Sequence, residues 1–351
     1  MQALRWHGPT DLRLDDVRAP ELSKADDVLI DVAACGICGT DLHEFAHGPN
    51  MIRQSPHPLT GAQPPLTLGH EFSGIVRGTG DGVTDLQAGQ LVTVDPCLRC
   101  HSCPPCLRGD YHLCAKGGSV GLACDGAFAA QVVVPRVNVL RVPDGVSAEA
   151  AAVAEPLAVG LHAAKQARIG AGDAVLILGA GPIGIAALLG AIVCGASSVY
   201  VSEPSANRAH MALNMGATEV FDPTVTDVRR EAFLRTGKSG PDAVIEATGR
   251  KEAVEQAITS VRRGGTVSVV GISADRLGVD LRELVLYERY VAGSLGYHHD
   301  IERVLKLIAA GRLDTAPFVT SVAPLSEGVA TFEQLSASRT AGLKILLTPK
   351  G

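Results

Sequence analysis

The fold of this chain is decided by the stretch Val175-Leu-Ile-Leu-Gly179-Ala-Gly181-Pro-Ile-Gly184. An apolar run typical of a buried strand passes directly into the pattern G-x-G-x-x-G. Gly179 permits a tight turn, Gly181 lets a pyrophosphate approach the backbone, and Gly184 allows the following helix to pack on the strand. The N-terminus of that helix faces the anion. The stretch therefore predicts the dinucleotide site of a Rossmann fold.

A carboxylate comes at the end of the next predicted strand. Glu203 follows the apolar run 199–202, where it can accept hydrogen bonds from both ribose hydroxyls of the cofactor and repel a 2′-phosphate. NAD is therefore the expected cofactor rather than NADP. The competing interpretation, a structural glycine turn with a surface glutamate, is disfavoured by the strand-turn-helix context. The other expected cofactor contacts are Pro182 and Ile183 at the start of the helix, and Arg208. Arg208 is expected to cover the adenine; the alternative, a contact with a phosphate, would favour NADP.

Hydrophobic patterns divide the chain into two kinds of segment. Up to about residue 150, short β-branched runs alternate with Gly, Pro and Asp clusters, which is typical of a compact β domain. From about residue 155, strand and helix patterns alternate, which indicates βαβ units and a parallel sheet. The tail looks unlike this middle part. We therefore expect an α/β protein in which residues 1–153 and 297–351 form a β-rich domain and residues 154–296 form an inserted Rossmann domain.

Individual elements follow from the same patterns. In the first part, strands are expected at 3–6, 12–17, 28–34, 72–76, 91–94 and 128–134. In the middle part, strands are expected at 174–178, 199–202, 243–246 and 266–270, and helices at 156–167, 182–194, 206–215, 227–236 and 251–261. After Gly271, a strand is expected near 290–294, a helix near 301–310 and a strand at 344–347. The proline-rich segment 48–65 is expected to be a long surface loop beside a site.

Composition excludes several classes of partner. Of the 351 residues, 46% are hydrophobic, which is enough for large cores, and 4% are aromatic, which argues against a stacking platform for nucleic acid. The formal net charge of -6 leaves no broad basic patch. The longest apolar runs are broken by glycine and proline, and residues 1–30 carry many acids. Neither a membrane span nor a signal peptide is therefore expected, and the expected location is cytoplasmic.

A cluster of cysteines within residues 96–115 predicts a structural zinc site. Its C-x-x-C-x-x-C spacing, with one further cysteine, offers four thiolates from a single lobe. Four protein ligands leave no open position, so such a site cannot do chemistry. Disulfides are not expected here in the absence of a secretory signal. One ambiguity remains, because Cys97 could replace the first of the four. The four expected ligands are Cys100, Cys103, Cys106 and Cys114.

A second group of polar residues begins at Cys35-Gly-Ile-Cys-Gly-Thr-Asp-Leu-His43, directly after a buried-strand pattern. Two interpretations compete: a Cys-x-x-Cys redox or zinc pair, or a single metal ligand, Cys38, among groups that handle protons. His70, Glu71 and Glu155 could complete an open metal site with this thiolate, but they lie far apart in the sequence. Spacing alone does not assign them, since a lone histidine is more often an ordinary core or surface residue. A glutamate before a helix is more often an N-terminal helix charge.

Five motifs occur in order along nearly the whole chain: C-G-I-C-G-T-D-x-H, G-H-E, the four-cysteine lobe, E-P-L-A and G-A-G-P-I-G. Together they resemble the zinc-dependent medium-chain alcohol and polyol dehydrogenases. The resemblance implies a GroES-like β-rich catalytic domain with an inserted Rossmann domain, two zinc ions per chain, NAD, and a homodimer or homotetramer. It implies that Cys38, His70 and Glu155 bind the catalytic zinc. Glu71 would then lie beside the metal or exchange into its coordination shell.

Within this family the chain is most similar to the 2,3-butanediol dehydrogenases, which reduce acetoin. The segments responsible are 5–9, 57–65, 68–74 and 293–297. This similarity implies oxidation of a secondary alcohol or vicinal diol to the ketone, with hydride transfer from a zinc-bound alkoxide to nicotinamide. Sorbitol and L-threonine 3-dehydrogenases share many of the same motifs and are the alternatives within the family. Outside it, the alternatives are a zinc-free NADPH reductase of related fold and a non-enzymatic zinc- or nucleotide-binding protein.

Thr40 and His43 are the expected proton carriers. Because zinc lowers the pKa of a bound alcohol, the alcohol proton must leave a dry site. Thr40 can accept this proton through its hydroxyl, and His43 can pass it toward solvent. The alternatives are a helix cap for Thr40 and an ordinary exposed histidine for His43. Asp41 is expected at the start of the helix, or as a partner that orients a metal ligand.

Overall fold

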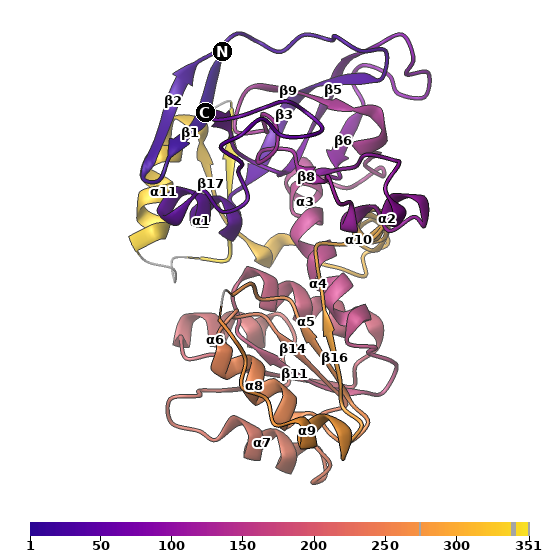
Figure 1. Ribbon diagram of the computed structural model, residues 1–351, viewed down its shortest axis with the longest axis vertical. Helices are drawn as coiled ribbons and strands as arrows, with labels where there is room; N and C mark the ends of the chain where they lie inside the picture. The colour runs from indigo at the N-terminus through magenta and orange to yellow at the C-terminus, as the bar shows by residue number, and fades with distance from the viewer. Residues whose placement is uncertain (274, 338–341, 350–351) are drawn as a thin grey trace. The chain divides into compact units, whose positions relative to one another are not determined.

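The computed structural model describes residues 1–273, 275–337 and 342–349. The chain divides into two compact units, which Figure 1 shows with all their elements. Unit 1 contains Met1–Glu155 and the described residues from Leu305 onward, and unit 2 contains Pro156–Val304.

The second boundary between the units differs from the expected one. The first division falls after Glu155, next to the expected position, but residues 297–304 belong to unit 2 rather than to the β-rich domain. The reason is Asp300, which is fully buried at the start of α10 (Asp300–Ala309). Its carboxylate lies 3.1 Å from Nδ1 of His162 and 2.8 Å from Nζ of Lys165, both on α4 (Ala154–Gln166).

Unit 1 is built around the long strand β3 (Asp27–Gly36). The other strands of its seven-stranded sheet are β5 (Glu71–Thr79), β6 (Leu91–Val94), β9 (Gln131–Pro135), β10 (Val139–Arg141), β17 (Val319–Pro324) and β18 (Lys344–Thr348). Directly beside β3, and antiparallel to it, lie β5, β9 and β18. The register sets Gly36 opposite Glu71. The residues that follow β3 and those that precede β5 therefore meet at one end of the sheet.

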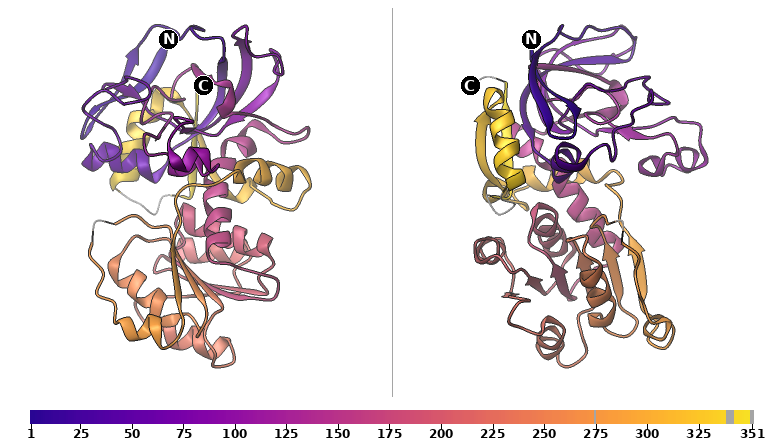
Figure 2. Two further views of the ribbon diagram at one scale, coloured as in Figure 1. Left: turned by 45° about the vertical axis from the view of Figure 1, so that its right-hand side comes forward. Right: turned by 60° about the vertical axis from the view of Figure 1, so that its left-hand side comes forward.

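A smaller sheet holds the N-terminal strands, and it packs on the core of unit 1 together with a helix from the C-terminal part of the chain. Its strands are β1 (Gln2–Gly8), β2 (Asp11–Asp16) and β4 (Leu66–Thr67), in the order β2-β1-β4. Leu4 and Trp6 of β1 are buried in one core with Phe128 and Phe332. Phe332 comes from α11 (Gly328–Ala337), and its ring meets that of Phe128 edge-on at 5.8 Å. Figure 2 shows these C-terminal segments beside the N-terminal strands.

The remaining elements of unit 1 are short. Its further helices are α1 (Gly39–His47), α2 (Pro104–Leu107) and α3 (Ala148–Ala152), and a two-stranded sheet is formed by β7 (Cys97–Leu98) and β8 (Gly118–Ser119). Single 3₁₀ turns lie at Tyr111–Leu113, Arg136–Asn138, Ala316–Phe318 and Leu325–Glu327. Segment 48–65 contains neither helix nor strand, as predicted.

Unit 2 is a six-stranded parallel sheet with helices packed on it. Its strands are β11 (Ala174–Leu178), β12 (Ser198–Ser202), β13 (Glu219–Phe221), β14 (Ala243–Glu246), β15 (Thr266–Val269) and β16 (Tyr290–Gly293). Its helices besides α4 are α5 (Pro182–Cys194), α6 (Ala206–Asn214), α7 (Val228–Arg235), α8 (Lys251–Ser260) and α9 (Leu281–Val285). The order β13-β12-β11-β14-β15-β16 is that of a Rossmann fold, so the predicted fold class is confirmed.

The helices of unit 2 cover the hydrophobic strands. α5 contacts β11, β12 and β14, while α8 contacts β14 and β15. Leu176, Val244 and Val267, one from each of the three central strands, are fully buried in the same core as Ile258 of α8. Across the part of the chain that the structure describes, no helix has the length and apolar character needed to cross a membrane.

Candidate active site

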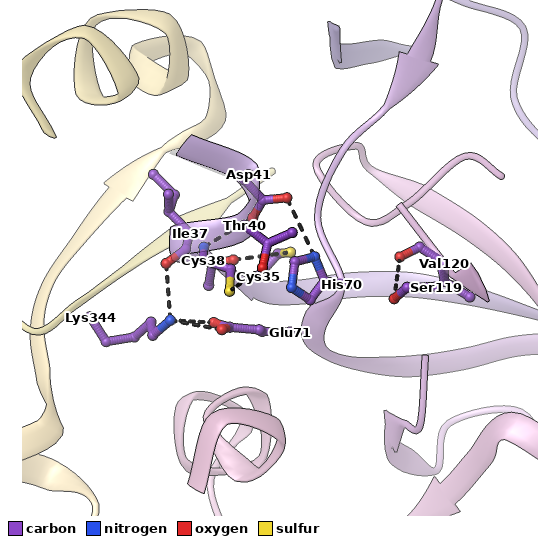
Figure 3. Close-up of polar contacts among 11 residues, drawn as sticks. Cys35, Ile37, Cys38, Thr40, Asp41, His70, Glu71, Ser119, Val120 and Lys344 are labelled. Carbon is purple, nitrogen blue, oxygen red and sulfur yellow. Dashed lines mark hydrogen bonds and ion pairs between the residues drawn. The ribbon is translucent and has the colours of Figure 1, made fainter. Parts of the chain in front are cut away.

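Three side chains that could hold a metal ion meet where β3 ends and β5 begins (Figure 3). The thiol of Cys38, a ring nitrogen of His70 and a carboxylate oxygen of Glu71 all lie within 4.8 Å of one another. His70 and Glu71 are buried, and Cys38 is half-buried directly before α1. Thiolate, imidazole and carboxylate are the ligand types that zinc uses in proteins, so this donor set fits zinc.

Asp41, in the first turn of α1, orients two of these groups. Its Oδ2 accepts a hydrogen bond from the backbone N–H of Cys38 at 2.9 Å, and its Oδ1 lies 3.4 Å from Nδ1 of His70. This leaves Nε2 of His70 available to a metal. Burial by itself lowers the pKa of His70, but the negative charges of Asp41 and Cys38 raise it well above its usual value. The site therefore carries excess negative charge, which favours a bound cation.

Lys344, the first residue of β18, is a member of the site that the sequence patterns missed. Its Nζ donates to Oε1 and Oε2 of Glu71 at 2.8 and 2.6 Å, and to the carbonyl oxygen of Ile37 at 3.0 Å. Lys344 is 2% exposed and Glu71 is 0% exposed. Burial by itself lowers the pKa of this lysine, but Glu71 first, and then Cys38, raise it above its ordinary value. The one signal in the sequence is a charged residue inside an apolar strand pattern.

Glu155, the expected third zinc ligand, is not part of the close group. It is buried in the first turn of α4, at the last position of unit 1. Its negative charge contributes to the raised pKa of Lys344, so it belongs to the charged surroundings of the site. The structure thus brings Cys38 and His70 together with Glu71, whereas the expected set has Glu155 in that place.

The other residues of the 35–43 stretch lie as follows. Thr40 is half-buried, with its Oγ1 3.7 Å from Sγ of Cys38. His43 is exposed on α1, three residues further along and so on the same side of the helix. Cys35 is fully buried, and burial raises the pKa of its thiol well above the usual value. A thiol that is buried and protonated in this way is a poor redox partner for Cys38.

The side chains of Cys100, Cys103, Cys106 and Cys114 gather in the lobe at residues 96–115. The sulfur atoms of its cysteines all lie within 4.8 Å of one another, and none of the nine cysteines, all within the described residues, forms a disulfide. Sγ of Cys103 lies 3.8 Å from Sγ of Cys114, the spacing of about 3.8 Å that tetrahedral Zn–S bonds of about 2.3 Å require. Hydrogen bonds from Ser102 lower the pKa of Cys100 to about 5, which favours the thiolate that zinc binds. The four sulfurs fit a structural zinc.

Cys97 does not belong to this group. It lies in β7, where its backbone N–H donates to Oδ1 of Asp95 at 3.0 Å. Asp95 also accepts from Arg99 at 3.0 Å, and the guanidinium of Arg99 covers the ring of Tyr111 at 3.8 Å. Cys97 thus belongs to the base of the lobe, and the group of four sulfurs that lie together contains Cys100 and not Cys97.

The glycine-rich stretch of unit 2 has the geometry of a phosphate-binding turn. Gly179 ends β11 with φ +97°, and a Cβ there would lie 2.7 Å from Cγ2 of Thr248. A Cβ on Gly184 would come 1.9 Å from the carbonyl oxygen of Gly179, so α5 packs against the turn as predicted. Gly181 faces open space apart from one guanidinium nitrogen. Pro182 and Ile183 form the first turn of α5 and are half-buried.

Glu203 is connected to this turn directly. It is buried just after β12, where Oε2 accepts the N–H of Ala180 at 2.8 Å and Oε1 accepts the N–H of Ser205 at 2.9 Å. Each carboxylate oxygen has a further lone pair for a ligand. Arg208 is half-buried, and its Nη1 lies 4.0 Å from the position of a Cβ on Gly181. Its guanidinium therefore lies at the glycine turn itself.

Family models match both units. The alcohol dehydrogenase GroES-like domain matches residues 24–144, and the zinc-binding dehydrogenase domain matches residues 182–310. The chain belongs to the zinc-binding alcohol dehydrogenase family. It is accordingly an oxidoreductase, of a family that binds zinc and a nicotinamide cofactor.

Individual members of the family resemble this alcohol dehydrogenase over their whole length. The (R,R)-butanediol dehydrogenase of Neisseria gonorrhoeae is 34% identical over 355 residues, which cover 99% of each chain. The crystal structure of 2R,3R-butanediol dehydrogenase from Bacillus subtilis is similar with a TM-score of 0.94 at 35% identity, over 99% of each chain. A zinc-binding dehydrogenase from Sinorhizobium meliloti 1021 bound to NADP is similar with a TM-score of 0.91 at 33% identity, again over 99% of each chain.

Proposed function

We propose that this alcohol dehydrogenase interconverts a vicinal diol and its hydroxyketone, of the 2,3-butanediol and acetoin type, with NAD as the hydride acceptor. The observation that carries the proposal is similarity to butanediol dehydrogenases over 99% of the chain in both sequence and structure. The cluster of Cys38, His70 and Glu71 supports it, because the chemistry needs an open metal site.

Cys38, His70 and Glu155 are the proposed ligands of the catalytic zinc. When bound, zinc acts as a Lewis acid that polarises the substrate oxygen and lowers the pKa of the alcohol. Asp41 lies beside Nδ1 of His70, so Nε2 is the ring nitrogen that would bind the metal, and Asp41 accepts the N–H of Cys38 at the start of the helix. The lobe at residues 96–115 is the proposed second zinc site, and four thiolates there leave no position for a substrate.

Thr40 and His43 are the proposed route for the alcohol proton. Thr40 lies beside the ligand sulfur and is half-buried, so its hydroxyl can take a proton from a substrate that occupies the open position. His43 is exposed and its imidazole can hand the proton to solvent. The relay thus runs from a half-buried hydroxyl to an exposed imidazole on one helix.

NAD is the proposed cofactor because of Glu203. Its buried carboxylate sits at the end of the second Rossmann strand, where a 2′-phosphate would meet a like charge. Arg208 favours NADP instead, since its guanidinium lies at the glycine turn, and the similar dehydrogenase from Sinorhizobium meliloti 1021 is bound to NADP. Removal of the Glu203 charge therefore distinguishes the two cofactors.

A homodimer or homotetramer is the proposed state in solution. In unit 2, α9 and the edge strand β16 expose apolar side chains that a monomer would leave in water. Leu281 and Val285 are 71% and 72% exposed, and Tyr290 and Val291 of β16 are also exposed. An exposed hydrophobic edge strand of this kind is a ready surface for association.

A substrate panel tests the proposed activity. NAD or NADP reduction is measured with the three 2,3-butanediol stereoisomers, sorbitol, L-threonine and simple primary alcohols, before and after treatment with a zinc chelator. The expected result is the highest kcat/KM with one butanediol isomer and NAD, and loss of that activity after chelation. Higher kcat/KM with sorbitol or threonine would overturn the substrate, and activity unaffected by removal of all zinc would overturn the metal chemistry.

A further inference from the structure

Lys344 forms a fully paired, buried ion pair with Glu71 beside the candidate metal site. Its ammonium group is buried, and its three protons have three acceptors: both oxygens of Glu71 and the carbonyl oxygen of Ile37. A buried ion pair of this kind is weak evidence for stability, because apolar residues of similar volume often stabilise a core as well. The pair therefore calls for a role in the site.

Glu71 lies close enough to Cys38 and His70 to become a ligand of the same metal ion. One of its oxygens lies within 4.8 Å of both the Cys38 sulfur and a ring nitrogen of His70, so it could complete a set of three ligands. A fourth ligand from Glu155 would then close the coordination shell, and a closed shell has no position for substrate. In the structure, however, both oxygens of Glu71 accept from Lys344. Such charge-assisted bonds are about twice as strong as neutral ones.

The backbone around the pair is shaped to hold it. A Cβ on Gly36 would come 2.4 Å from Oε2 of Glu71 and 3.1 Å from Cδ of Lys344, so the absence of a side chain at this position makes room for both. The strands also fix the partners, because β3 pairs with β5 at Gly36–Glu71 and with β18 at Gly36–Leu346. Through Ile37, the ammonium reaches the peptide that leads into Cys38.

We propose that Lys344 is the positioning residue that holds Glu71 off the catalytic zinc and so keeps one coordination position open. The proposal rests on the zinc site of the proposed function and goes beyond it by assigning what controls Glu71. Lys344 acts through Glu71 and touches neither substrate nor cofactor. Without the ammonium, the buried carboxylate of Glu71 turns to the metal.

Zinc release from the holoenzyme tests this proposal without any substrate. Release to an excess of a colorimetric chelator is followed over time in the wild type, and the phase that is missing from Cys38→Ser is assigned to the catalytic zinc. In Lys344→Met we expect this phase to slow at least tenfold, because Glu71 becomes a ligand, and kcat to fall with it. In Lys344→Met/Glu71→Gln the phase should return to the rate of Glu71→Gln alone.

Three further variants complete the design. Lys344→Arg keeps the charge and should release zinc as the wild type does. Lys344→Gln should slow release in the same direction as Lys344→Met, and it replaces that variant if Lys344→Met fails to fold. Thr320→Val is the matched control: it removes the hydrogen bond at 3.0 Å to the carbonyl oxygen of Lys344 and leaves the ammonium in place, so release should not change.

The outcomes separate this proposal from the proposed function. Faster or unchanged release in Lys344→Met or Lys344→Gln, or no return in the double variant, overturns the role of Lys344. A wild type that releases zinc as expected but oxidises no alcohol of the substrate panel overturns the proposed activity and leaves the role of Lys344 intact. A wild type without the Cys38-dependent phase overturns both.

Discussion

Oδ1 of Asp41 lies 3.4 Å from Nδ1 of His70, while the other oxygen of the same carboxylate accepts the N–H of Cys38 at 2.9 Å. One buried side chain thus connects the start of α1 with the segment that leads into β5. The position of the His70 imidazole is therefore coupled to the start of the helix beside Cys38.

Asp41→Asn should weaken zinc binding at the catalytic site by about 10- to 100-fold, as loss of the partner of a ligating histidine does in other zinc sites. The amide can replace one of the two contacts but not the negative charge beside the imidazole. Competition with a chelator of known affinity measures the effect. Asp31→Asn on β3 is the control, because its carboxylate is partly exposed and accepts from Gln131 and Arg77 away from the site. Equal zinc affinity in Asp41→Asn and the wild type would remove Asp41 from the metal site.

Cys38→Ser should abolish turnover and lose one zinc per chain while the protein remains folded. Serine is a much weaker zinc ligand than a thiolate, and Cys38 is the N-cap residue of α1 rather than a core residue. Metal analysis and circular dichroism check the two statements. Cys35→Ala serves as the comparison: if Cys35 is only a small buried thiol, this variant should retain both zinc ions and most of the activity. A loss of activity in Cys35→Ala with full zinc content would restore the redox-pair interpretation.

Cys103→Ser should lower the melting temperature by about 5 °C or more and reduce the zinc content by one, with a smaller effect on kcat for the folded fraction. The reason is that the lobe depends on four sulfurs around one point and has little core of its own. Cys97→Ser should change neither zinc content nor melting, because Cys97 lies outside the sulfur cluster. Unchanged melting in Cys103→Ser, measured by calorimetry, would contradict a structural role for the lobe.

The fold was largely predictable because its signals are local. The strand, turn and helix around Gly179 follow from hydrophobic periodicity and glycine spacing, and the structure reproduces them at nearly the same residues. The strand expected at 128–134 begins instead at Gln131. The backbone of Phe128 forms hydrogen bonds with Leu4 and Leu68 instead of with β3, the partner strand of β9. A periodic hydrophobic pattern does not reveal which strand is the partner. The three-residue strand β13 was too short to give a pattern.

A group of site residues could be predicted from spacing only where all its members lie in one short segment of the sequence. The four cysteines of the lobe lie in one segment, and their sulfurs meet as expected. The catalytic group was assigned by resemblance, because Cys38 follows β3, His70 precedes β5, and the two meet only through the β3–β5 register. Lys344 was missed for the same reason: its partner Glu71 is 273 residues away, and no pattern links a lysine in a C-terminal strand to a carboxylate in β5.

Glu203→Gln should shift cofactor preference toward NADP, with the ratio of kcat/KM for NAD to that for NADP falling about tenfold or more. The amide removes the charge that opposes a 2′-phosphate. Its carbonyl oxygen can still accept the N–H of Ala180, so the glycine turn keeps its shape. Glu203→Ala, which loses this contact as well, should show the same shift together with weaker binding of both cofactors. A ratio that stays constant in Glu203→Gln would mean that Arg208 or another residue sets the preference.

Asp300 should make stability depend on pH in the acidic range. Burial by itself raises its pKa, but hydrogen bonds from His162 and Lys165, and from the N–H of His298, hold it well below the usual value. The pKa of Asp300 is lower in the folded protein than the value of about 3.9 in the unfolded chain. The stabilisation by the ionised carboxylate is therefore complete above that value and is lost as the pH falls below it. Asp300→Asn should therefore lower the free energy of unfolding by about 2 kcal/mol at pH 7. Calorimetry at pH 7 and at pH 3 should show a smaller difference between the variant and the wild type at pH 3. Glu302→Gln, on the exposed side of α10, is the control for loss of one charge. A difference that does not shrink on acidification would mean that Asp300 stabilises unit 2 by packing rather than by charge.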